Sequence, residues 1–312
     1  MKSALRVAGD AALRWSPAQL YFRGTAARRL AVLAYHGVDD PRQFARQLDH
    51  LVRMAHPVSL DEVIAAARDG VDLPPHSVLV TFDDGYRSVL EDGAPLLQER
   101  GIPAVAFVLT SLLESDRPFW WVEVEALVRN GGTAGSGYDG AASGRATPAS
   151  YVRKLKTVSD QERRDVITRL RETASRPANP MPQLGSHELL ALEAAGIDVG
   201  NHTVSHPCLD RCDDETARSQ VRGAHESLTA VLGHAPRAFA YPNGNFDTRA
   251  EQVLKEQAYQ VAFLFDHRLT PTVPADPLRI SRLRVSTTTS LDRFAAIVSG
   301  LHPAVHHARG GG

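Results

Sequence analysis

Seven short apolar runs, separated by segments with helical spacing, constrain most strongly how this chain can fold. The runs are rich in β-branched and aromatic residues and are nearly continuous, which is typical of strands buried on both faces of a sheet. They are Leu30–Tyr35, Val78–Phe82, Ala104–Leu109, Ile197–Gly200, Ala238–Tyr241, Val261–Phe265 and Leu278–Val285. Strands that alternate with helices indicate a parallel sheet. We therefore predict an α/β fold, and seven strands favour a distorted seven-stranded (β/α) barrel over an open doubly wound sheet.

The segments between the runs have the apolar spacing of helices. Phe44–Met54 places apolar residues three and four apart. Ser59–Arg68 begins with Ser59 followed three residues later by Glu62, the signature of a capping box. Further helices are predicted over residues 93–101, 187–196, 215–232 and 247–257.

One region, from about residue 111 to 185, interrupts this alternation and is predicted to be an insertion after the third strand. It contains the aromatic cluster Phe119-Trp120-Trp121, a flexible loop rich in Gly, Ala and Ser at about 130–150, and a charged helical pattern. We accordingly divide the chain into an N-terminal helical segment (1–29), a barrel (30–303) and a disordered tail (304–312).

Polar residues follow four of the predicted strands at the point where each strand ends. Tyr35-His36-Gly37, Asp83-Asp84, Asn201-His202 and Pro242-Asn243-Gly244 stand at these positions. In parallel α/β folds the carboxyl ends of the strands meet at one rim, where active sites collect. The sequence therefore predicts one site built from all four clusters.

Two pairs of residues at this rim suggest a metal site. Asp83 and Asp84 are adjacent, so their carboxylates point to different sides, and one can bind a metal while the other acts as a base. His202 and His206 are four residues apart, a spacing that suits a shared metal. Two histidines and one carboxylate leave positions on the metal open for water and substrate.

The motifs Thr81-Phe82-Asp83-Asp84-Gly85-Tyr86, then His202-Thr-Val-Ser-His206-Pro, then Phe239-Ala-Tyr-Pro-Asn-Gly244 resemble those of the polysaccharide deacetylase family (carbohydrate esterase family four, the NodB-homology domain). The resemblance covers about residues 30–300. Ala34-Tyr-His-Gly-Val38 and the Phe-Trp-Trp cluster look like the branch associated with exopolysaccharide biosynthesis. The family implies a distorted seven-stranded barrel, in agreement with the strand count above.

The resemblance also implies roles. Asp84, His202 and His206 would hold a divalent metal, most often zinc, with cobalt, nickel or manganese also tolerated. Asp83 would be the general base for a water bound to that metal, whose pKa the metal lowers towards about 7. The backbone N–H of Asn243 would stabilise the oxyanion. The implied reaction is hydrolysis of a non-peptide C–N bond, the N-deacetylation of an acetylated sugar in a polysaccharide or glycan precursor.

The sequence departs from the family pattern at two functional positions. Many relatives have an arginine before the proline that orients the aspartate base, but Ala240-Tyr241 precede Pro242 here. Arg279 or Arg282 could replace it, and we favour Arg282. The Leu-x-His motif that supplies the proton donor has no clear equivalent. His36 and His267 are the candidates, and the alternative for His36, which we rank above it, is a structural histidine that bonds backbone at a strand end.

Four aromatic residues are predicted to bind substrate. Tyr86 and Tyr241 belong to the motifs above, while Trp120 and Trp121 could form a platform for a sugar ring. Alternatively, the two tryptophans anchor the insertion to the barrel.

The amino-acid composition limits the kinds of partner that this chain can be expected to bind. Lys+Arg 35 against Asp+Glu 36 gives no basic field that would attract nucleic acid. No apolar stretch reaches the roughly 18 residues of a spanning helix, and no signal peptide is apparent, so a cytoplasmic location is expected. An N-terminal helix with Trp15, Leu20 and Tyr21 among arginines leaves peripheral membrane contact open. Cys208 and Cys212 are expected to be ordinary thiols.

Two alternatives to the deacetylase hypothesis remain. One is a small-molecule amidohydrolase or deformylase on the same barrel. The other is a binding module that holds glycan without catalysis.

Overall fold

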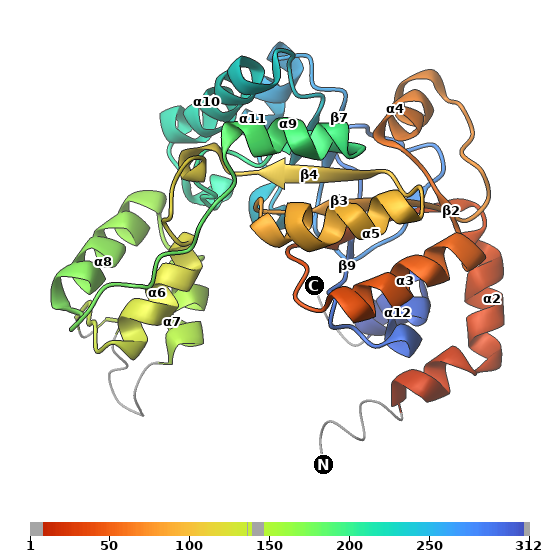
Figure 1. The fold of residues 1–312 in the computed structure, drawn as a ribbon, viewed down its shortest axis with the longest axis horizontal. Helices are drawn as coiled ribbons and strands as arrows, with labels where there is room; N and C mark the ends of the chain where they lie inside the picture. The colour runs from red at the N-terminus through yellow and green to blue at the C-terminus, as the bar shows by residue number, and fades with distance from the viewer. Residues whose placement is uncertain (1–8, 136, 139–146, 309–312) are drawn as a thin grey trace.

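The apolar runs of the sequence form the strands of one curled sheet. The computed structural model describes residues 9–135, 137–138 and 147–308. The sheet order is β7-β6-β5-β4-β3-β1-β8, and helices surround it (Figure 1). Its strands are β1 (Arg29–Tyr35), β2 (His56–Pro57), β3 (Ser77–Phe82), β4 (Ala104–Val108), β5 (Ile197–Asn201), β6 (Ala238–Ala240), β7 (Val261–Phe263), β8 (Thr270–Pro271) and β9 (Leu283–Arg284). The pairs from β7 to β1 are all parallel, as the alternation of strands and helices predicts.

The seventh predicted strand, Leu278–Val285, connects the two edges of this sheet. Ile280 forms a parallel bridge with Phe263 of β7, and β9 pairs with β1 so that Leu283 stands opposite Leu33. The first part of the segment pairs with one edge of the sheet and the second part with the other. The segment therefore forms fewer strand pairings than the continuous strand that we expected. The predicted distorted seven-stranded barrel is confirmed, with Arg282 at the point where the segment passes from one edge to the other.

Both faces of the sheet are buried, which explains why the strands read as continuous apolar runs. Leu33 and Phe82 lie in a cluster that also contains residues of the surrounding helices, such as Phe44 and Leu189. Residues of the opposite face, including Phe107, fill the interior of the barrel. Each large apolar side chain buried in this way contributes about 1.5–3 kcal/mol.

The predicted capping box at Ser59 is confirmed. Ser59 Oγ accepts from Glu62 N (3.2 Å), and Glu62 Oε2 accepts from Ser59 N (2.7 Å). Around the sheet lie α2 (Pro17–Ala26), α3 (Pro41–Met54), α4 (Leu60–Asp69), α5 (Ala94–Glu99), α9 (Ser186–Ala194), α10 (Asp214–Leu232), α11 (Thr248–Glu256), α12 (Leu291–Val298) and α13 (Leu301–Ala308).

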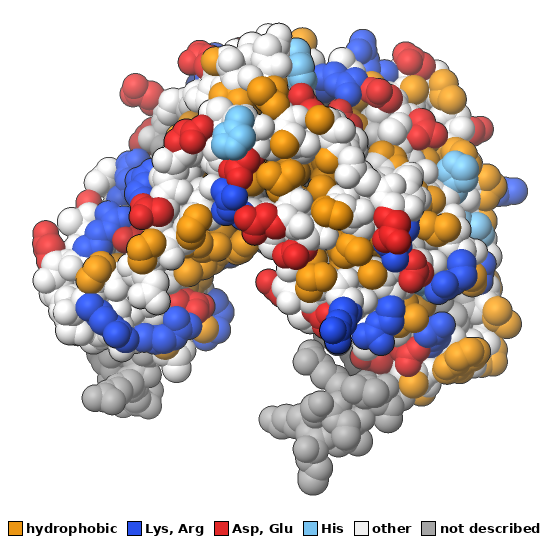
Figure 2. Space-filling view, in the orientation of Figure 1, with side chains coloured by type: hydrophobic (Ala, Val, Ile, Leu, Met, Phe, Trp, Pro, Cys, Tyr) orange, Lys and Arg blue, Asp and Glu red, His pale blue; other side chains and the backbone are white. Residues whose placement is uncertain are grey.

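The insertion after β4 has a small core of its own. Helices α6 (Trp120–Arg129), α7 (Pro148–Leu155) and α8 (Asp160–Thr173) pack around Leu127, Leu155 and Leu170. They stand to one side of the barrel (Figure 1), and Figure 2 shows a broad hollow between the two parts. Of the predicted flexible loop at about 130–150, residues 136 and 139–146 lie outside the described residues, and residues 148–150 belong to α7.

The C-terminal end differs from the expectation of a disordered tail. Residues 304–308 belong to α13, because Leu301 and Pro303 are buried and hold that helix against the rest of the protein. Residues 309–312 lie outside the described residues. Within the described part of the chain, no helix combines the length and apolar character that crossing a bilayer requires.

Candidate metal centre and active-site cavity

The polar clusters that follow β1, β3, β5 and β6 line a cavity of about 380 Å³. The barrel contributes His36, Asp83, Asp84, His202, His206, Asn243, Gly244, Phe265 and Arg284, and the insertion contributes Trp121, Val152 and Lys156. The cavity therefore brings together seven of the residues predicted for the site, from elements far apart in the sequence.

Asp84, His202 and His206 form a candidate metal centre within this cavity. Asp84 Oδ1 lies 3.5 Å from His202 Nε2 and 3.6 Å from His206 Nε2. All three residues are buried, and one possible ligand atom from each lies within 4.8 Å of the other two. Among the described residues, this is the only such group of histidine, cysteine and acidic side chains that could hold a metal ion.

The unpaired atoms of the cluster fit a cation. Asp84 Oδ1 is buried without a hydrogen-bond partner, which is costly for a charged oxygen unless an ion satisfies it. His202 Nδ1 lies 2.8 Å from the carbonyl oxygen of Ala240, so it carries the proton and leaves the Nε2 lone pair facing Asp84. One carboxylate and two imidazoles are a donor set that suits zinc and other divalent transition metals.

Electrostatics at the cluster also favour positive charge. Burial lowers the pKa of His206 to about 3, so this imidazole is neutral at pH 7 and one of its ring nitrogens keeps a lone pair. Burial would lower the pKa of His202 as well, but the nearby carboxylates of Asp83 and Asp84 outweigh it and raise that pKa. The pair of carboxylates thus attracts a cation to the space between the histidines.

Backbone turns in the left-handed region aim these side chains. Asp84 has φ 74° and is followed by Gly85 with φ 81°, while His206 has φ 54°. Aspartate tolerates this region better than most residues, and residues held there cost on the order of 1–3 kcal/mol each. Because of this turn after β3, the carboxylates of Asp83 and Asp84 face different partners.

Asp83 faces Arg282 and not the histidine pair. Arg282 Nη1 lies 2.7 Å from Asp83 Oδ1, and Nη2 lies 2.9 Å from Oδ2. Arg282 is fully buried, and its guanidinium lies over the rings of Phe107 (5.5 Å) and Phe265 (5.6 Å). Burial alone would raise the pKa of Asp83, but Arg282 and His202 lower it to about 2. Asp83 is therefore ionised at neutral pH.

The two tryptophans of the insertion occupy different positions. The Trp121 ring lines the cavity, contacts His206 edge-on at 4.8 Å and stacks on Phe119 at 5.0 Å. Trp120 Nε1 instead donates to the backbone oxygen of His206 (3.1 Å), and Arg163 covers its ring at 4.7 Å. Trp121 thus faces the cavity, where a platform for a sugar ring would lie. Trp120 instead anchors the insertion to the loop that carries His206, which was the alternative considered from the sequence.

Comparison with known proteins matches the sequence to a family. The model described as "Polysaccharide deacetylase" matches residues 70–138 and 155–262, which include Asp83, Asp84, His202, His206 and Asn243. This chain belongs to the polysaccharide deacetylase family. The family match is interrupted only within the insertion, between α6 and the end of α7.

Curated proteins and solved structures similar to this polysaccharide deacetylase include the following. The poly-β-1,6-N-acetyl-D-glucosamine N-deacetylase of Escherichia coli K12 is 27% identical over 248 residues, which are 77% of this chain. The chain spans about a third (32%) of the length of that curated relative. Among solved structures, the Streptococcus pyogenes deacetylase PplD has TM-score 0.60 at 16% identity and covers 86% of this chain and 98% of its own. IcaB from Ammonifex degensii has TM-score 0.59 at 21% identity and covers 87% and 97%. These structures share the fold.

Three residues predicted for the deacetylase site lie elsewhere. Tyr241 is fully buried in the cluster under α10 and α11, because alternation along β6 turns Phe239 and Tyr241 away from the barrel interior. His267 accepts from Arg284 N (3.0 Å) and contacts His302 of α13, so it lines a different pocket. Tyr86 packs on Phe119 at 4.5 Å, behind the Trp121 ring. Of the two predicted proton donors, only His36 lines the cavity.

Sequence reasoning missed two cations at the cavity, Lys156 and Arg284. Arg284 donates to the backbone oxygen of Phe265 through Nε (3.0 Å) and Nη2 (2.8 Å). It stands two residues after Arg282 on one extended segment, and that spacing could have identified it. Lys156 follows α7 in the insertion, and no local signal indicates its approach to the barrel. Cys208 and Cys212 are free and buried and are not part of the metal cluster.

Proposed function

We propose that this chain removes the acetyl group from N-acetylated amino sugars in a polysaccharide. One observation carries the proposal: a buried carboxylate held by Arg282 lies beside the buried Asp84-His202-His206 cluster in a single cavity. Poly-β-1,6-N-acetyl-D-glucosamine is the first polymer to test, because the curated relatives that match this chain deacetylate it according to their names.

We propose that zinc occupies the metal centre, with Asp84 Oδ1, His202 Nε2 and His206 Nε2 as its protein ligands. Three protein ligands are typical of catalytic zinc, which keeps a further position open. A divalent metal held there would lower the pKa of water and polarise the acetyl carbonyl. Cobalt, nickel and manganese accept the same donor atoms and belong in the metal assay.

Asp83 is the proposed general base. Arg282 takes one lone pair of each carboxylate oxygen, and a carboxylate has about four acceptor positions, so Asp83 can still accept a proton from the attacking water. The bidentate pair also fixes the direction in which the remaining lone pairs point. The base is thus oriented by a buried arginine that comes from the last barrel segment.

The proton then has to reach the departing amine. His36 is the proposed donor, because its ring lines the cavity with Nε2 4.0 Å from Asp84 Oδ2 and is partly exposed to solvent. The backbone N–H of Asn243 is the proposed donor to the oxyanion, and Asn243 lines the same cavity with φ 56°. Water adds to the acyl carbon, the C–N bond breaks, and acetate and a free amine leave.

The experiment measures acetate release from four substrate classes: β-1,6-linked N-acetylglucosamine oligomers, chitooligosaccharides, peptidoglycan fragments and nucleotide-linked N-acetyl sugars. Formate release from formyl compounds is measured alongside. We expect chelator-sensitive acetate release from an oligomer, abolished by Asp83→Asn. Oligomer binding without any acetate release from metal-loaded protein would instead favour the binding module. Formate release alone would favour the deformylase alternative.

A further inference from the structure

A second cavity, of about 440 Å³, lies at the opposite end of the barrel from Asp83. Ala31 of β1 and Ser77 and Val78 of β3 line it, and these residues stand near the amino ends of their strands. Ser77 and Asp83 are six residues apart along one extended strand, which is about 20 Å. This volume falls within the range of about 300–1,000 Å³ that small-molecule sites occupy, and the metal centre does not use it.

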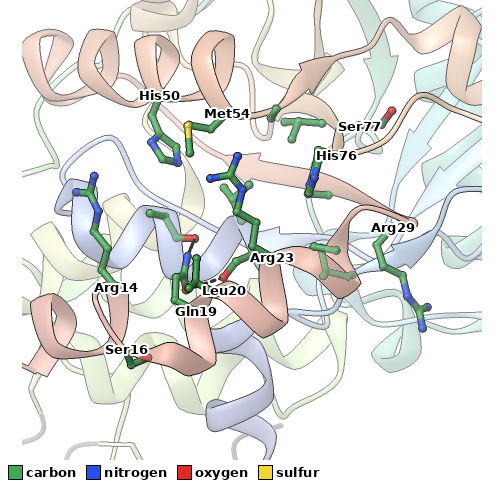
Figure 3. A pocket seen from close by; sticks show the side chains of 18 of the residues that line it. Arg14, Ser16, Gln19, Leu20, Arg23, Arg29, His50, Met54, His76 and Ser77 are labelled. Carbon is green, nitrogen blue, oxygen red and sulfur yellow. Dashed lines mark hydrogen bonds between the residues drawn. The ribbon is translucent and has the colours of Figure 1, made fainter.

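Helix α2 and helix α3 form the walls of this cavity (Figure 3). Arg14 Nη1 binds Asp292 Oδ1 at 2.6 Å, just before α2, and Gln19 Nε2 donates to the backbone oxygen of Ala295 (3.2 Å). Ser299 Oγ donates to Gln19 Oε1 (3.0 Å). The helix is therefore fixed against α12 while a space remains between it and α3.

Among the described residues, those that line the cavity include several cations and no carboxylate. The basic and imidazole side chains at its wall are Arg14, Arg23, Arg29, His50 and His76. Within the described part of the chain, no ion pair joins Arg23 or Arg29 to an acidic side chain. In Figure 3 Arg23 extends from α2 into the space below α3, towards Met54 and His76. Burial, followed by the charges of Arg14, Arg53 and Arg23, lowers the pKa of His50 to about 4, which agrees with the arginines gathered around this cavity.

Most of the remaining lining is apolar, although Ser16, Gln19, Ser77 and Ser299 also line the cavity. The apolar part includes Met54 and Ala55 at the end of α3, Leu269, Ala295 and Val298. A hydrophilic anion alone would leave this surface without a partner. An acyl chain would bury it, at about 0.8 kcal/mol for each CH₂ group removed from water.

The mouth of the cavity carries large apolar side chains in contact with solvent. Trp15 and Leu20 both line it, although they are 78% and 75% exposed, and the neighbouring Tyr21 is 69% exposed. Exposed apolar residues among arginines are typical of helices that meet a lipid surface.

We propose that this cavity binds an anionic amphiphile, with its phosphate or carboxylate head at Arg23 and its acyl chain against Met54 and Val298. Arginine suits such a head because its planar fork donates two parallel hydrogen bonds. The site is separate from the metal centre, and the proposal does not depend on the deacetylase activity.

Two probes distinguish a free amphiphile from a bilayer lipid. Dodecyl phosphate below its micelle concentration is titrated calorimetrically into the full chain. Vesicles of phosphatidylcholine, with and without phosphatidylglycerol, are tested by flotation. Binding of dodecyl phosphate alone supports a free amphiphile as the ligand. Flotation that requires phosphatidylglycerol supports a bilayer lipid. Binding of neither probe overturns the proposal.

Substitutions test whether the amphiphile binds in this cavity. Arg23→Glu should weaken binding by at least about tenfold, since a like charge then faces the head group, and Arg23→Gln should have a smaller effect of the same sign. Met54→Trp should weaken it by filling the acyl part. Arg153→Glu makes the same charge change on α7 of the insertion and should leave binding unchanged. Binding that survives both Arg23→Glu and Met54→Trp, in protein that still melts cooperatively, would rule the site out.

Discussion

Arg282 holds both oxygens of Asp83, with Nη1 2.7 Å from Oδ1 and Nη2 2.9 Å from Oδ2. The arginine itself is fixed, because its Nε donates to the backbone oxygen of Leu264 (2.8 Å) and its Nη1 also reaches Thr81 Oγ1 (3.1 Å). A charged pair that is buried in this way depends on both partners, since loss of one leaves the other as an uncompensated buried charge.

Replacing Arg282 by Met should therefore impair both activity and stability. We expect acetate release to fall by at least about 100-fold, within the range that a positioned base contributes. The free energy of unfolding should fall by about 3–5 kcal/mol. Burial would then raise the pKa of Asp83 with no arginine to oppose it, so the acid limb of the kcat/KM profile should move to higher pH. Arg282→Lys, which keeps the charge but loses the fork, should be intermediate.

Arg279 offers the matched control, because it is the other arginine that the sequence allowed in this role. It is itself 44% exposed and binds the buried carboxylate of Glu251 (2.7 Å), which Lys255 also pairs. Arg279→Met should change the unfolding free energy by no more than about 1 kcal/mol and leave the pH profile in place. If Arg279→Met impaired activity as strongly as Arg282→Met, the positioning role of Arg282 would be wrong.

The metal content of variants should distinguish the roles of Asp83 and Asp84. Asp84→Asn should reduce the bound metal well below one equivalent, because its Oδ1 faces both histidines, whereas Asp83→Asn should retain the metal and lose activity. Elemental analysis of dialysed protein measures the difference. Removal of the metal should also lower Tm, since a ligand at about 100 times its Kd stabilises the folded state by about 2.7 kcal/mol. Equal metal content in both variants would contradict this assignment.

The sequence predicts the rim of the site well, because strand ends of a parallel sheet meet whatever the details of packing. Asp83, Asp84, His202 and Asn243 each stand within two residues of the end of an apolar run, and a strand boundary places them. The direction of a side chain on a strand is harder to predict. The run Ala238–Tyr241 is buried on both faces and has no alternation of polar and apolar residues, so nothing in the sequence indicates that Tyr241 turns away from the interior.

Residues from the insertion are predicted less well for a different reason. Trp121 and Lys156 reach the cavity through the packing of α6, α7 and α8 against the barrel, and such long-range contacts leave no local pattern. Similarly, His267 follows a strand as expected, but its φ of 60° and its hydrogen bond with α13 carry it to another pocket. A strand boundary places the backbone, and the turn that follows decides where the side chain goes.

The two tryptophans should give different kinetic changes. Trp121→Ala should raise KM by up to about tenfold with metal content unchanged, in line with the 0.5–1.5 kcal/mol of an aromatic contact. Trp120→Phe removes the donor to the His206 backbone oxygen and should weaken metal affinity with little effect on KM. Titration with a competing chelator and initial rates at saturating metal measure the two effects. The same change of KM in both variants would mean that the tryptophans act only by holding the insertion.

Stability should fall on mild acidification because of the histidines between β7 and the C-terminal helices. Burial, with the nearby His302 and His306, lowers the pKa of His267 to about 3, and burial with Arg293 lowers that of His302 to about 4. In the unfolded chain both titrate near 6.5, so the unfolded state binds more protons below that pH. Their contribution to stability is complete above about pH 6.5 and is lost as the pH falls towards 4. Protonation would also cost His267 Nδ1 its hydrogen bond from Arg284 N.

Urea unfolding at pH 7.5 and 5.0 should show this loss of stability, and His302→Asn should reduce it. His187→Asn, at an exposed position, is the control. A loss that is equally steep in His302→Asn and in the wild-type chain would assign the pH dependence to other groups.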